Sequence, residues 1–220
     1  AEFKKISTHP VASTTGIHDP TENLVNSSRH VECSDCHNPH ATLSAEATAP
    51  AASGSLNNVK GIGSSGSVVA PLINEYELCY RCHADSIDRG TALINRQFLQ
   101  TNTRFEFSSS SASYHPVETI GSNPDVPSLI SPYTESSLMY CTDCHNSDRG
   151  PNAGGIGPNG PHGSVYAPLL ERRLRLTDEG NESPANYALC YKCHDRNSIL
   201  NDESFAYHKK HIADEKTACT

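Results

Sequence analysis

The stretch CSDCH at residues 33–37 recurs in altered form as CYRCH at 79–83, CTDCH at 141–145 and CYKCH at 190–194. Eight of the nine Cys in the chain form these C-x-x-C pairs, and a His follows each pair directly. Residues three and four apart lie on one face of a helical turn, so two thiols can reach the vinyl groups of one porphyrin while the imidazole faces its iron. This spacing is the covalent attachment signature of c-type haem. The sequence therefore predicts four haem c groups.

Other common uses of paired cysteines explain the pattern less well. A disulfide scaffold gives no reason for the His after each pair, and a Cys₄ zinc ribbon leaves all four His unexplained. A thioredoxin-like redox site needs one C-x-x-C in a βαβ setting, and neither condition holds. The expected covalent attachments are Cys33, Cys36, Cys79, Cys82, Cys141, Cys144, Cys190 and Cys193, and the expected proximal iron ligands are His37, His83, His145 and His194.

The composition points to an interior that side chains alone do not fill. Only 35% of the 220 residues are hydrophobic and 6% aromatic, with no Trp and one Met. Because so little apolar area cannot offset the entropy of many loop residues, we expect the haem-free chain to be disordered. The expected fold is mostly irregular chain with a few short α-helices, wrapped around the haems. Short helices are expected around 76–85, 186–196 and 91–99, and strands at most as short ribbons.

The charge and hydropathy patterns exclude several classes of protein. The net charge of −8 and the lack of a long basic run argue against nucleic-acid binding. No apolar run approaches the ~18 residues of a membrane span. The chain opens at AEFKK, with neither initiator Met nor hydrophobic signal core, so we expect a mature exported chain whose signal peptide has been removed.

The chain contains an internal repeat of a two-haem unit. THPV, CSDCHN, GSVVAPL and ELCYRCHADSI in the first half correspond to YHPV, CTDCHN, GSVYAPLL and ALCYKCHDRNSI in the second. The predicted organisation is a dihaem unit over 1–112, a second over 113–207 and a tail over 208–220. The tail begins like a third copy. Cys219 is either a lone thiol or disulfide half-partner, or the first residue of a fifth motif.

A proximal His leaves the sixth iron position to another ligand. Met139 is the only Met and precedes Cys141 by two residues, where we expect it to pack, so the sixth ligands should be histidines. Two candidates lie in the duplicated HPV element, one in the interval between the motifs of each unit, and one before each of the segments that open at Cys33 and Cys219. These candidates are His9 and His115, His40 and His162, and His30 and His211. We expect His18 to be a surface residue.

A terminal histidine offers a route to polymerisation. His9, or one of His208 and His211, would ligate a haem of a neighbouring copy of the chain. A head-to-tail contact of this kind that does not close gives a filament. The sequence thus yields the hypothesis of a homopolymer in which subunits share a His ligand.

CHNPH, YHPV, GPHGS, CYKCHD and the F-x-x-H-x-x-H tail together resemble the paired C-x-x-C-H multihaem cytochromes c of metal-respiring and sulfate-reducing microbes. The four-haem count also resembles the extracellular cytochrome filaments called nanowires. The resemblance covers nearly the whole chain. It implies bis-His haems stacked in close pairs along a wire, export to the cell surface or beyond, and electron delivery to extracellular acceptors or redox partner proteins.

The ligand set favours electron transfer over catalysis. Two axial imidazoles leave an iron no open position, so such haems pass electrons and do little bond chemistry. We therefore expect no enzyme, and a subunit of a conductive filament rather than a monomeric periplasmic shuttle. A multihaem reductase, which needs one open iron, is the remaining alternative. Tyr80 and Tyr191, inside two of the motifs, are expected to pack on porphyrin edges.

Overall fold

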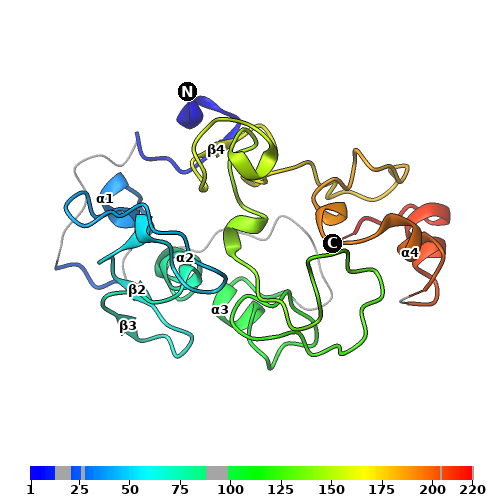
Figure 1. Cartoon of the computed structure of the whole chain (residues 1–220), viewed down its shortest axis with the longest axis horizontal. Helices are drawn as coiled ribbons and strands as arrows, with labels where there is room; N and C mark the ends of the chain where they lie inside the picture. The colour runs from blue at the N-terminus through cyan, green and yellow to red at the C-terminus, as the bar shows by residue number, and fades with distance from the viewer. Residues whose placement is uncertain (13–20, 26–27, 88–98, 204, 220) are drawn as a thin grey trace. The chain divides into compact units, whose positions relative to one another are not determined.

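The computed structural model describes residues 1–12, 21–25, 28–87, 99–203 and 205–219, and most of this chain is irregular (Figure 1). The expectation of an irregular chain with a few short helices is confirmed. Its wrapping around haems stays a prediction. The α-helices are α1 (Cys33–Cys36), α2 (Glu75–His83), α3 (Thr103–Glu106) and α4 (Arg196–Leu200), and the shorter helical turns are η1 (Glu2–Lys4), η2 (Gly54–Leu56), η3 (Cys141–Asp143), η4 (Pro151–Ala153), η5 (Cys190–Lys192) and the π-helical η6 (Lys210–Asp214).

The strands of the described residues form two antiparallel ribbons. β1 (Ser7–Thr8) pairs with β4 (Gly163–Ser164), and β2 (Gly61–Ile62) pairs with β3 (Val68–Val69). Each strand has two residues, so the expectation of short ribbons is confirmed. No helix in the described part of the chain combines the length and apolar character needed to cross a bilayer.

The chain divides into two compact units. The first, here the 9–121 unit, comprises residues 9–121 and 138–141. The second, the 142–220 unit, comprises residues 1–8, 122–137 and 142–220. The N-terminal residues belong to the second unit because β1 pairs with β4. The boundaries of the predicted dihaem repeats stay a prediction.

Helix α2 forms where the sequence predicts it, beginning at residue 75 rather than 76 and ending at 83 rather than 85. Its start is set by a capping box in which the Asn74 N–H donates to the Glu77 carboxylate at 3.0 Å. It ends because Ala84 leaves the helical region, with φ −99° and ψ −96°. The helix packs directly on β2, since a Cβ atom at Gly61 would lie 2.8 Å from the Cβ of Glu77.

The expected helix over 186–196 is wrong as a continuous element. Turns cover residues 184–189, η5 follows, and α4 begins only at Arg196. Asp195 is the N-cap of α4, and its carboxylate accepts the Ser198 N–H at 2.8 Å while its own backbone is extended. An N-cap residue cannot also lie inside a helix, so the chain must leave helical geometry there. The third expected helix, over 91–99, falls almost entirely outside the described residues.

The buried apolar residues described in the 9–121 unit form two small clusters. One contains five buried residues and the other three. Tyr80, at 1% exposed, lies in the larger cluster and comes from inside the second C-x-x-C pair. The larger cluster is Ile62, Tyr76, Tyr80, Ala84 and Val117, and the smaller is Leu56, Val59 and Leu72.

Candidate cofactor-attachment sites

The four C-x-x-C-H sequences each begin on a helical turn. We name them motif 1 (33–37, on α1), motif 2 (79–83, on α2), motif 3 (141–145, on η3) and motif 4 (190–194, on η5). In motifs 1 and 4 the His N–H donates to the carbonyl of the first Cys, at 2.9 and 3.0 Å. This bond closes one turn, so that His and Cys lie one above the other. No two of the nine cysteines are joined by a disulfide.

Local capping explains the turn of motif 1. The Glu32 N–H donates to Asp35 Oδ2 at 2.7 Å, and Glu32 and Asp35 together form a capping box around α1. Such reciprocal bonds satisfy backbone N–H groups that a short helix would otherwise leave without partners. Asp35 is only 6% exposed, so this turn is anchored by a buried carboxylate.

Three of the four motif histidines are held through Nδ1. The His37 ring bonds to the Ser55 carbonyl at 3.1 Å, and the His145 ring to the Pro168 carbonyl at 3.0 Å. The third, His194, lies 2.9 Å from the Ser128 hydroxyl. A carbonyl only accepts, so Nδ1 of His37 and His145 carries the proton and Nε2 carries the lone pair. This tautomer, fixed by an outer hydrogen bond, is the one that metal-bound histidines adopt.

A cavity of about 390 Å³ adjoins motif 1. This volume falls within the usual range for cofactor and ligand pockets. Its walls include a thiol and an imidazole of the same motif, which is what a covalently attached porphyrin requires. The lining residues are Val11, Glu32, Cys33, Ser34, His37 and Pro39.

His9 lies beside His83, the histidine of motif 2. The ring centroids of His9 and His83 are 6.2 Å apart, with 60° between the ring planes. Two imidazoles on opposite sides of one metal have centroids about 6 Å apart, because each metal–nitrogen bond is about 2 Å and each nitrogen lies about 1 Å from its ring centre. The separation therefore fits two axial ligands of one iron, both from the 9–121 unit.

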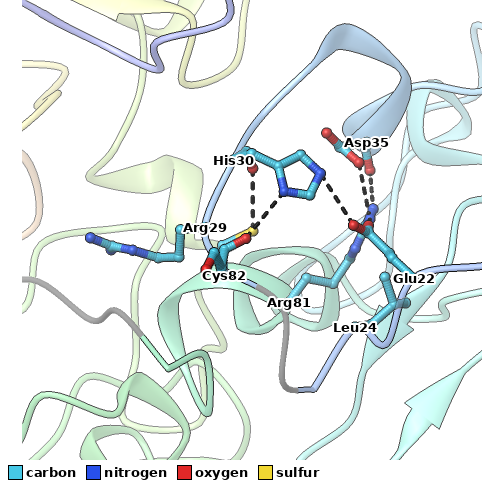
Figure 2. A pocket seen from close by; sticks show the side chains of 8 residues that line it. Glu22, Leu24, Arg29, His30, Asp35, Arg81 and Cys82 are labelled. Atoms are coloured by element: carbon cyan, nitrogen blue, oxygen red, sulfur yellow. Dashed lines mark hydrogen bonds and ion pairs between the residues drawn. The ribbon is translucent and has the colours of Figure 1, made fainter. Parts of the chain in front are cut away.

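Contacts join motifs 1 and 2. Arg81, between the two Cys of motif 2, donates to the carbonyl oxygen of Asp35 in motif 1 and to Asp35 Oδ1, the latter at 3.1 Å. Figure 2 shows the Arg81 guanidinium reaching between Asp35 and Glu22, whose carboxylate lies 3.5 Å away. The turns that carry the two motifs are therefore hydrogen-bonded to each other.

Motifs 3 and 4 are joined in the same way. Lys192, between the two Cys of motif 4, donates to the carbonyl oxygen of Asp143 in motif 3 at 2.7 Å. Its Nζ also lies 3.1 Å from Oε1 of Glu171, a carboxylate that is 1% exposed. Cys141, the first residue of motif 3, packs in the 9–121 unit against the cluster that contains Tyr80, and its thiol, together with burial, raises the pKa of Cys79 well above its usual value.

The sequence contains a pattern that predicts the contacts between motifs 1 and 2 and between motifs 3 and 4. The residue before the second Cys is acidic in motifs 1 and 3 and basic in motifs 2 and 4. Opposite charges at the same position of alternating motifs indicate an interaction between the members of each pair. Sequence reasoning missed it because, of the residues between the cysteines, it considered only the tyrosines and not the charged residues beside them.

Glu22, His30 and Asp35 are the one group of three potential metal ligands that converges among the described residues. Arg81 already supplies the positive charge there, so the group does not need a cation (Figure 2). His30 Nε2 lies 3.2 Å from Glu22, and its Nδ1 lies 3.1 Å from the Ser28 carbonyl. For His30 to bind an iron, as the sequence predicts, its contact with Glu22 must break. The described cysteines form no zinc-like cluster.

The remaining predicted sixth ligands lie apart from one another. His40 and His115 are exposed in loops. His162 lies edge-on to Phe3, with ring centroids 5.8 Å apart, and the exposed His211 in η6 lies 6.3 Å from Phe205. Their roles as ligands stay predictions.

Each of the two tyrosines within the motifs is hydrogen-bonded to a glutamate, which the sequence did not reveal. The Tyr80 hydroxyl donates to Glu118 Oε1, and the Tyr191 hydroxyl donates to Glu182 Oε1 at 2.8 Å. Burial raises the pKa of both phenols, which keeps them neutral donors. Their packing on porphyrin edges stays a prediction.

No family model, curated protein or solved structure matches this chain. The assignment of the site therefore depends on the chemistry of its residues.

Proposed function

We propose that this chain is a tetrahaem c-type cytochrome that transfers electrons and is not an enzyme. The observation that carries the proposal is the recurrence of four C-x-x-C-H turns in which three of the histidines are anchored through Nδ1. Haem c, when bound, supplies reversible one-electron chemistry at its iron. The eight motif cysteines would hold the four groups, and the four motif histidines would be the proximal ligands.

The residues of the chain support electron transfer in two further ways. His9, whose ring centroid lies 6.2 Å from that of His83, would be the second iron ligand of the haem held by motif 2 and would then exclude substrate from that iron. Hydrogen bonds connect motif 1 to motif 2 and motif 3 to motif 4. Within each pair, this proximity favours electron movement between the two sites.

The extended form of the proposal is a subunit of an extracellular conductive filament. Because His9 lies next to His83 of its own unit, a shared ligand between subunits would more simply come from the C-terminal segment. There His211 is exposed in η6, while the Ile212 side chain beside it is buried and anchors the turn. A monomeric periplasmic shuttle is the alternative. Electron microscopy of the purified, haem-loaded protein separates these alternatives, because a filament subunit would polymerise and a shuttle would stay monomeric.

Haem stoichiometry tests the proposal directly. A pyridine haemochrome assay of protein from an exporting host should return four haems per chain. The double variant Cys33→Ala/Cys36→Ala should return three, because motif 1 then has no attachment thiols. The matched control Cys219→Ser, which alters the one cysteine outside the motifs, should keep four. A wild-type value far below four would refute the proposal.

A further inference from the structure

Arg81 and Lys192 share one contact: each donates to the backbone carbonyl of the acidic residue in the preceding motif. Arg81 also donates to the buried carboxylate of Asp35. A bond to a carbonyl within the turn constrains the position of the turn itself. Charged donors form the stronger hydrogen bonds in proteins, so these contacts are suited to fixing a distance.

The contacts also occur at equivalent places in the two units. Asp35 and Arg81 directly precede Cys36 and Cys82, and Asp143 and Lys192 directly precede Cys144 and Cys193. Each contact therefore links two positions adjacent to attachment thiols. The two units use different side chains, a guanidinium in one and an ammonium in the other, to reach the same kind of acceptor.

The surroundings of both cations are built to hold them in place. The Arg81 side chain is 8% exposed and lies against Asp35 and Glu22, and the Lys192 side chain is 12% exposed and lies against Glu171. Partly buried charges of this kind are costly unless they are paired, so the cation and its acceptors depend on one another. Neither cation would attach a haem or bind its iron. The contact that they share therefore needs another explanation.

We propose that Arg81 and Lys192 are positioning residues that hold the two attachment turns of each pair at a fixed separation and so set the electronic coupling between the two haems of that pair. This inference rests on the proposed function. Coupling between redox groups falls steeply with distance, so a turn that moves by even a small amount changes it. The device acts separately in the 9–121 unit and in the 142–220 unit.

The test uses the haem-loaded full chain and compares two substitutions at each site. Arg81→Met and Lys192→Met keep the length of the side chain but remove the donor. Arg81→Lys and Lys192→Arg keep a cation of similar reach. Each of these variants introduces the residue type that the other unit has at the equivalent position. The readout is the exciton-coupled circular dichroism couplet in the Soret band, which reports the separation and orientation of neighbouring haems, measured beside the haem count.

Each Met variant should lose about half of the couplet, and the double Met variant most of it, because the two pairs lie in separate units and their effects should add. The Lys and Arg exchanges should retain it. Two controls remove charge without removing the bond to the carbonyl. Arg172→Met takes away the other cation beside Glu171, whose Nε lies 3.4 Å from Oε1, and Glu22→Gln neutralises the second carboxylate beside Arg81. Both controls should keep the couplet.

The proposal is overturned if the Met variants carry four haems and keep the full couplet. It is also overturned if the conservative exchanges or the charge controls lose as much as the Met variants. Should Arg81→Met assemble with fewer haems, the Lys192 variants decide. Failure of the proposed function gives a different result, since the wild type itself would then lack four haems.

Discussion

The imidazole rings of His9 and His83 lie 6.2 Å apart in the 9–121 unit. One belongs to the HPV element and the other closes motif 2, so a long stretch of chain separates them in sequence. Their distance matches that of two imidazoles on one metal, which makes His9 the candidate second ligand of the haem proposed at motif 2.

Replacing His9 should open one iron. In His9→Ala the haem held by motif 2 would have no second imidazole, so the reduced protein should bind one carbon monoxide per chain, while the wild type binds none. The difference spectrum of the ferrous protein with carbon monoxide measures this. His18→Ala, which alters a histidine expected from the sequence to be a surface residue, is the control and should bind none. Absence of binding in His9→Ala would remove His9 from the ligand set.

Removing the Ser128 hydroxyl should raise the reduction potential of one haem. That hydroxyl lies 2.9 Å from His194 Nδ1, and Ser128 is 3% exposed. When Nε2 binds the iron, Nδ1 carries the proton and the Ser128 hydroxyl accepts it, which makes Nε2 more basic and stabilises the ferric state. Ser128→Ala should shift the equilibrium of that haem by about tenfold, or ~59 mV for one electron. Potentiometric titration measures the shift. Ser137→Ala, whose hydroxyl caps a turn at Thr134, should leave all potentials in place.

Glu118 should make stability depend on pH. Burial raises its pKa above the ordinary value of 4.5, against the lowering effects of the Tyr80 hydroxyl and the Arg104 charge. Since the folded state binds this proton more tightly, the contribution of Glu118 to the free energy of unfolding is greatest below pH 4.5 and declines as pH rises through the raised pKa. Glu118→Gln keeps an acceptor for Tyr80 but cannot titrate.

Denaturant unfolding of the wild type and Glu118→Gln at several pH values between 4 and 7 measures this effect. The Gln variant should gain stability relative to the wild type as pH rises across that window. A relative gain by the wild type would show that the carboxylate, once ionised, is stabilised rather than penalised in the fold.

Cys219 should be the one thiol left in the mature protein. Burial raises its pKa to about 11, so at pH 8 only about a thousandth of it is thiolate and native alkylation should be slow. Below pH 11, the alkylation rate should rise about tenfold for each unit by which the pH is increased, as long as the fold persists. In denaturant, iodoacetamide should modify one thiol per chain, counted by mass spectrometry. Cys219→Ser should show none, and more than one in the wild type would mean that motif thiols are unattached.

The success and failure of the secondary-structure predictions have local causes. Helix α2 was predictable because apolar spacing and the Asn74–Glu77 capping box agree. Over 186–196 the same apolar spacing was misleading, because Asp195 caps a new helix and interrupts the old one. The apolar periodicity of a sequence gives no sign of a competing helix cap, so the helix prediction failed at Asp195.

The same distinction holds for the candidate site. The attachment pattern lies within five consecutive residues, and its chemistry is local, so four sites can be predicted without knowledge of any distant contact. The repeat likewise shows that the sites come in pairs. The partners of those sites are another matter: Asp35 for Arg81, Ser128 for His194 and His9 for His83 each come from chain far away in sequence.

The number, spacing and chemistry of the attachment motifs were thus readable from the residues alone, because a helical turn of known geometry dictates what Cys-x-x-Cys-His can hold. The groups that bond to the His37, His145 and His194 imidazoles, and the cation that joins each pair of turns, depended on how the irregular segments fold back. Those segments have no periodicity, and their many backbone conformations are restricted only by long-range packing and hydrogen bonds. The tertiary fold therefore determined the hydrogen-bonding partners of each motif, whereas the motif residues determined which group they are predicted to hold.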